Sequence, residues 1–68
     1  MTIDWNETRR IAQSMDTFTL RCALKDAIET ALSMDDLDRH LGGDRAGKYR
    51  DQCSVYRQVL RERENTRF

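Results

Sequence analysis

The chain has 68 residues, of which 12 are lysine or arginine and 12 are aspartate or glutamate, so its formal net charge is zero. So short a chain predicts one domain over residues 1–68, with a core too small for high stability by itself. The balanced charge argues against nucleic acid as the partner, because proteins that bind it usually carry a clear basic excess. Two cysteines and one histidine form no metal-binding pattern, and we expect no metal and no cofactor.

The first segment carries a helical pattern that begins just after Asp4. Asp4 and Glu7 fit a capping box, in which an N-cap acceptor is followed three residues later by a carboxylate. Polar residues around Ser14 and Thr17 disfavour a helix interior, so two alternatives stand. One is a single helix over about 5–32, and the other is a short helix with a restart near Thr17. We favour the single helix, because no glycine or proline interrupts the segment.

A second capping-box pattern begins at Ser33 and has Asp36 three residues later. This pattern predicts a short connecting helix over about 34–41, with Leu37 and Leu41 facing inward. A pair of glycines follows and ends that helix, since glycine readily adopts the left-handed conformation at a helix C-terminus.

The last segment, about 45–64, is an amphipathic helix whose apolar residues recur at spacings of three and four and therefore share one face. The chain is thus predicted to be all-α, as a helical hairpin of two long helices joined by a short one. One hairpin leaves wide apolar stripes exposed, so we expect two copies to pair as a homodimeric helical bundle. The predicted dimer and core seam consists of Phe18, Cys22, Leu24, Ile28, Tyr49, Cys53, Tyr56 and Leu60.

Two motif-like patterns lie around the glycine pair. Residues 42–48 satisfy the G-x-x-x-x-G-K part of a phosphate-binding loop, but Tyr49 follows in place of the serine or threonine that binds magnesium. Residues 34–54 can be aligned with a helix-turn-helix, yet several positions that its core requires are charged. We interpret the glycines as a helix end. A nucleic-acid-binding transcriptional regulator that uses the C-terminal helix remains the alternative function.

Enzymatic and membrane functions are not expected. His40 is the only histidine, and no base or nucleophile accompanies it in the sequence. A helical bundle of this size also has little room for the concave site that an enzyme needs. No stretch has the roughly 18 apolar residues that span a bilayer, and the N-terminal residues do not resemble a signal peptide. We therefore expect a soluble, cytoplasmic protein that is not an enzyme.

Arginine and tryptophan are the side chains that indicate protein binding. Arginine, tryptophan and tyrosine dominate the binding energy of protein interfaces, and most of the basic residues here are arginine. We therefore predict a small protein–protein interaction module, an inhibitor or adaptor that covers a site on a larger protein. The tryptophan also fits a hydrophobic staple, and the C-terminal arginines also fit a solvated helix face. The candidate partner-binding residues are Trp5, Arg9, Arg10, Arg57 and Arg61.

In size, two-helix plan and lack of a catalytic motif, the chain resembles the small proteins with which bacteriophages inhibit host proteins. That group includes anti-CRISPR proteins and inhibitors of host transcription regulators. The resemblance is one of style over the whole chain and rests on no residue motif, so it assigns no functional residues. It implies that the protein target is a host protein, such as a transcription regulator.

Overall fold

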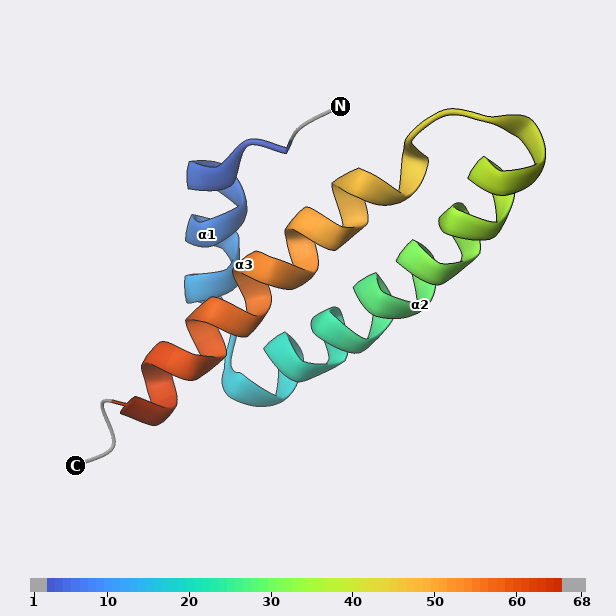
Figure 1. Cartoon of the computed structure of the whole chain (residues 1–68). Helices are drawn as coiled ribbons and strands as arrows, with labels where there is room; N and C mark the ends of the chain where they lie inside the picture. The colour runs from blue at the N-terminus through green and yellow to red at the C-terminus, as the bar shows by residue number, and fades with distance from the viewer. Residues whose placement is uncertain (1–2, 66–68) are drawn as a thin grey trace.

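The computed structural model describes residues 3–65, which form three helices connected by short turns (Figure 1). Helix α1 spans Trp5–Ser14, α2 spans Thr17–Leu41 and α3 spans Arg45–Asn65. No strand occurs in this part of the chain, which confirms the all-α class. Helices α2 and α3 lie side by side and antiparallel, and α1 packs on α3. Among residues 3–65, no helix has the length and apolar character needed to cross a membrane.

The chain breaks between α1 and α2, so the favoured prediction of a single helix over 5–32 is wrong. Met15 and Asp16 both have extended backbone angles, with ψ of 146° and 167°. The Asp16 carboxylate accepts a hydrogen bond of 2.7 Å from the backbone N–H of Thr19, and it thereby caps the start of α2. Both residues have negative φ, so the break needs no glycine. The alternative prediction, a restart near Thr17, is the correct one.

Helix α2 continues without interruption through the second capping-box pattern, so the separate helix predicted over 34–41 is the last part of α2. Asp35, one of the acids in that pattern, instead pairs with Arg50 of α3 at 2.6 Å. Leu37 and Leu41 are 40% and 70% exposed, whereas inward positions were predicted. Because α2 is one continuous helix, the residues that face α3 recur at helical spacing, and Leu37 and Leu41 do not fall on that face.

A helix ends at the glycine pair as predicted, and this helix is α2. A short loop connects α2 directly to α3. Gly42 and Gly43 have φ of 78° and 103°, a region that favours glycine because it has no Cβ. The backbone N–H of Gly42 donates a hydrogen bond of 2.8 Å to the carbonyl of Asp38, which closes the last turn of α2. The glycines therefore serve the helix end and the reversal of the chain.

Small buried residues line the interface between α2 and α3. Ala27 and Ala31 of α2 and Ala46 and Cys53 of α3 are all at least 92% buried. Small side chains let two helix axes approach closely. Larger apolar residues flank this row and are half-buried; these are Leu24, Ile28, Tyr49, Tyr56 and Leu60. Together with Cys53 they are the part of the predicted seam that lies in or beside the α2–α3 interface.

Two residues of the predicted seam, Phe18 and Cys22, lie on the outside of α2. Phe18 is 78% exposed, and Cys22 is an exposed free thiol. Leu20, which lies two positions from each of them, is fully buried. Residues two apart lie on nearly opposite sides of a helix, so the burial of Leu20 turns both neighbours toward solvent. The interpretation of Cys22 as a core residue is wrong for this fold.

The core cluster joins all three helices. Ala12 of α1, Leu20 of α2 and Val55 and Val59 of α3 are at least 97% buried and pack against one another. Helix α1 thereby covers a second face of α3, next to the face that α2 covers. The predicted two-helix hairpin lacked this third helix, because it treated α1 as the beginning of one long helix.

Asp38 connects the end of α2 to the start of α3. Its Oδ2 accepts a hydrogen bond of 3.0 Å from the backbone N–H of Ala46. Its Oδ1 accepts bonds of 3.1 Å from the backbone N–H and from the guanidinium of Arg45. The bond from Ala46 is the main reason why the pKa of the Asp38 carboxyl lies below its usual value, and the contacts with Arg45 lower it further.

We expect this carboxylate to make stability fall in acid. The pKa of Asp38 is lower in the folded than in the unfolded chain. Asp38 therefore contributes fully to the stability of the fold above the unfolded pKa of about 3.8. This contribution to stability is lost as the pH falls through the lower folded pKa. Asp38→Asn should lower Tm by about 5 °C near neutral pH and should reduce the acid sensitivity of Tm. Thermal denaturation followed by circular dichroism at neutral and acid pH measures both effects.

Asp36→Asn is the control for this prediction, because Asp36 is an exposed carboxylate on the same helix. Its side chain has no hydrogen bond or ion pair within residues 3–65. If Tm falls by the same amount in acid for wild type and for Asp38→Asn, Asp38 is not the source of the acid sensitivity.

Candidate functional site

A groove of about 350 Å³ lies between α2 and α3. Helix α2 contributes Ile28, Ala31, Leu32 and Asp35 to its lining, and α3 contributes Arg50, Cys53, Ser54 and Arg57. Arg57 lies two positions from both Val55 and Val59, whose side chains pack toward α1. The groove therefore opens on the side of α3 that faces away from α1.

The floor of the groove is apolar. Ala31 and Cys53 are buried in it, Ile28 is half-buried beside them, and Leu32 stands at the edge with 67% of its surface exposed. A leucine exposed to this extent beside a concave surface offers apolar area that a second molecule can remove from water.

The rim of the groove carries an excess of positive charge. Asp35 is the only acid in the lining, and its two oxygens accept hydrogen bonds from Arg50 at 2.6 Å and from Arg39 at 3.3 Å. Arg57 is exposed and forms no ion pair within residues 3–65. Two lining arginines against one aspartate leave a net charge of +1, and of the two arginines Arg57 is the one without an ion pair in residues 3–65.

Cys53 lies at the floor of this groove but is poorly suited to act as a nucleophile. Burial raises the pKa of its thiol, and the nearby positive charge of Arg57 opposes that shift only in part. A raised pKa keeps the thiol protonated at neutral pH, whereas nucleophilic cysteines need the thiolate. Within residues 3–65, no three histidine, cysteine, aspartate or glutamate side chains come together as metal ligands.

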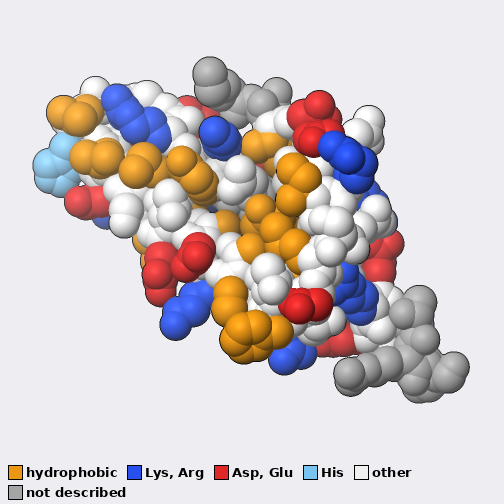
Figure 2. Space-filling model, turned by 180° about the vertical axis from the view of Figure 1, so that it is seen from behind, with side chains coloured by type: hydrophobic (Ala, Val, Ile, Leu, Met, Phe, Trp, Pro, Cys, Tyr) orange, Lys and Arg blue, Asp and Glu red, His pale blue; other side chains and the backbone are white. Residues whose placement is uncertain are grey.

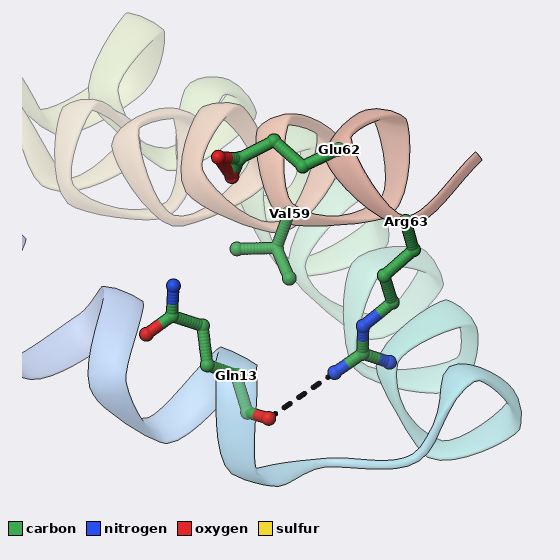
Figure 3. A pocket seen from close by; sticks show the side chains of 4 residues that line it. All are labelled: Gln13, Val59, Glu62 and Arg63. Atoms are coloured by element: carbon green, nitrogen blue, oxygen red, sulfur yellow. Dashed lines mark hydrogen bonds between the residues drawn. The ribbon is translucent and has the colours of Figure 1, made fainter. Parts of the chain in front are cut away.

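A second, smaller hollow of about 200 Å³ lies where α1 meets the end of α3, and it is lined by Gln13, Val59, Glu62 and Arg63 (Figure 3). Here the Arg63 guanidinium donates hydrogen bonds to the backbone carbonyls of Met15 at 2.6 Å and Gln13 at 3.2 Å. It also reaches the hydroxyl of Thr17 at 3.3 Å.

These bonds satisfy carbonyl groups that the end of α1 leaves without helical partners. Arg63 therefore holds the α1–α2 junction against α3, and the hollow is a structural feature. No local sequence signal marks this role, because Arg63 lies 46 to 51 positions from the groups that it binds.

The five predicted partner-binding residues do not form one patch. Arg9 donates to both carboxylate oxygens of Glu62 at 2.7 and 2.6 Å and so joins α1 to α3. Arg10 pairs with Glu7 within α1 at 2.6 Å. Trp5 begins α1 and is 48% exposed.

On α3, Arg57 lines the groove and Arg61 is exposed one turn later. The groove thus includes only one of the five predicted residues. Its other lining residues come from α2 and α3, and no sequence motif marks them as a group.

No protein-family model, curated protein or solved structure matches this chain. Figure 2 shows hydrophobic side chains in an interrupted band across one face, with charged side chains on both sides of the band. In residues 3–65 the large apolar side chains with at least 40% exposure are Trp5, Ile11, Phe18, Leu32, Leu37 and Leu41.

Proposed function

We propose that this protein is a protein–protein interaction module that binds a larger protein and covers a site on it, as an inhibitor or adaptor. The observation that carries the proposal is the α2–α3 groove, in which an apolar floor lies beside Arg57, a cation without a protein partner in residues 3–65. Interface hot spots combine these features, since apolar and arginine side chains pack together in places from which water is excluded.

The shape of the groove favours a helical or extended segment of the partner as the bound element. An apolar side chain of that segment would rest on Ile28 and Leu32, and a carboxylate would pair with Arg57. Helix-in-groove recognition uses such anchors at helical spacing. Binding of this kind blocks whatever the covered segment of the partner normally contacts.

Two further parts of the proposal come from the sequence. Following the resemblance to bacteriophage inhibitors, the target is a host protein such as a transcription regulator. The chain also acts as a homodimer, in which exposed apolar side chains of the single chain are removed from water.

The alternative, a nucleic-acid-binding regulator, is supported by the exposed arginines of α3. Arg57 and Arg61 lie one helical turn apart and form no ion pair within the described part of the chain. Two cations at this spacing fit a phosphate backbone, and such binding weakens steeply with salt. One experiment separates the two functions.

That experiment places an arginine in the groove by Ser54→Arg and a matched arginine outside it by Gln58→Arg. Ser54 lines the groove and is exposed, while Gln58 is an exposed residue of α3 that does not line it. The amount of partner protein captured from nuclease-treated bacterial lysate should fall about tenfold with Ser54→Arg, because the new side chain fills the groove. Gln58→Arg should capture it as wild type does.

Nucleic-acid binding makes the opposite prediction for the same two variants. Both add a positive charge to α3, so both should strengthen binding to DNA in a salt-dependent titration. Equal protein capture by wild type, Ser54→Arg and Gln58→Arg would contradict docking in the groove, and stronger DNA binding by both variants would establish the alternative.

A further inference from the structure

The outer face of α2 is covered by no other element within residues 3–65. Helix α2 contacts α3 through the side that carries Leu20, Ala27 and Ala31. The opposite side carries six exposed residues at spacings of four and three, which we name the outer stripe. The outer stripe consists of Phe18, Cys22, Lys25, Glu29, Leu32 and Asp36.

The spacing of the outer stripe is the spacing of a coiled-coil seam, in which residues alternate three and four apart along one helix face. Its ends are apolar or acidic, and its centre holds one lysine and one glutamate a single turn apart. We propose that the outer stripe binds the outer stripe of a second copy of this chain, with the two α2 helices antiparallel about a two-fold axis at the level of Ala27.

Charge complementarity selects this register and this direction. In the antiparallel pair, Lys25 lies opposite the partner's Glu29, and symmetry creates the same pair a second time. A parallel pair in register would place Lys25 against the partner's Lys25. Neither Lys25 nor Glu29 forms an ion pair inside its own chain within residues 3–65. Both side chains are therefore available across the interface.

Two apolar residues also meet in this register, because Cys22 lies opposite the partner's Leu32. Phe18, one helical turn further along the seam, lies opposite the partner's Asp36 and next to that leucine. Phe18 and Leu32 are 78% and 67% exposed in the single chain. Burying them supplies the apolar contribution to binding. With only a few apolar residues in each copy, the dimer should form at micromolar concentration, as small interfaces do.

This inference rests on the homodimer of the proposed function and specifies the surface that forms it; it is independent of binding in the groove. The second copy would approach the side of α2 that faces away from α3, and Leu32, at the edge of the groove, is the one residue that the groove and the outer stripe share. Ser54→Arg tests the groove, and the charge exchange at Lys25 and Glu29 tests the dimer.

The first test introduces Leu32→Cys, which brings a new thiol opposite Cys22 of the partner subunit. Cys53 is replaced by alanine in every protein tested, because it lines the same groove as Leu32 and would compete for the new thiol. Mild oxidation should give a covalent dimer on a non-reducing gel. Cys22→Ser should abolish this cross-link. The only thiols left are then the two at position 32, and they lie about 15 Å apart along the helix, too far for a disulfide.

Leu41→Cys is the matched control, because Leu41 is 70% exposed on the same helix but lies outside the outer stripe. It should cross-link at least about tenfold less than Leu32→Cys, since its thiol has no cysteine opposite it in this register. Equal cross-linking of the two variants, or cross-linking that does not need Cys22, would overturn the proposal.

The second test exchanges charges and needs no cysteine. Lys25→Glu places two negative charges opposite each other, at position 25 and at Glu29 of the partner subunit. Glu29→Lys places two positive charges opposite each other. Each substitution should raise the dimer dissociation constant about tenfold in sedimentation equilibrium. The double variant Lys25→Glu/Glu29→Lys should restore it. A wild-type chain that stays monomeric up to millimolar concentration, or a double variant that does not recover, would overturn the proposal.

Discussion

Replacement of Leu20 by alanine is expected to cost about 3 kcal/mol in the free energy of unfolding. Leu20 is the largest side chain that is fully buried in residues 3–65, and it packs with Ala12, Val55 and Val59 where the three helices meet. Alanine leaves a cavity there that rigid helices cannot close. A domain of this length has a total stability of roughly 3 to 10 kcal/mol, so the variant should be partly unfolded without denaturant.

Urea denaturation followed by circular dichroism measures this loss, and Leu41→Ala is its control. Leu41 belongs to the same helix but is 70% exposed, so its replacement should change the free energy of unfolding by no more than about 0.5 kcal/mol. If the two alanine variants unfold at the same urea concentration, the packing of α1, α2 and α3 around Leu20 is wrong.

Replacement of Arg63 by alanine is expected to release α1 from α3. The guanidinium binds carbonyl groups at the end of α1 and the hydroxyl of Thr17 at the start of α2. Loss of charged hydrogen bonds to partly buried carbonyl groups costs about 2 kcal/mol, which corresponds to a fall in Tm of about 10 °C for a domain of this size. Hydrogen exchange should become faster in α1, because its last carbonyls then lose their partner.

Arg61→Ala is the control for this effect. Arg61 is exposed, lies on the same helix and has no ion pair within residues 3–65. Its removal should change Tm by no more than about 3 °C. Arg63→Lys should fall between the two, since one ammonium group cannot reach the carbonyls at the end of α1 and the hydroxyl of Thr17 together, as the planar guanidinium does. The same hydrogen exchange in α1 for Arg63→Ala and wild type would contradict the role of Arg63.

Several elements of the fold were predictable from local sequence. Asp4 caps α1, with its carboxylate accepting a hydrogen bond of 3.1 Å from the backbone N–H of Glu7. Gly42 and Gly43 end α2 with positive φ. These features depend on interactions between residues at most four apart, so the amino-acid pattern determines them before any tertiary contact forms.

The candidate groove was only partly predictable. Arg57 was identified as a candidate because arginine is common at interfaces, and Ile28 and Cys53 were identified as seam residues because of their helical spacing. Nothing in the sequence places these three side chains in one concavity, because Ile28 and Cys53 lie 25 positions apart and meet only through the antiparallel pairing of α2 and α3.

By itself, the sequence determined the helical class, the apolar face of α3 and the helix end at the glycine pair, because short-range periodicity and local backbone preference are sufficient for each. Only the tertiary structure decided where the first long segment breaks. Local signals at Asp16 and at Ser33 are similar, but the break forms at Asp16, where Arg63 binds the free carbonyls of α1. It does not form at Ser33, where the neighbouring Asp35 pairs with Arg50 across the two helices. Long-range contacts therefore choose between local signals of similar strength.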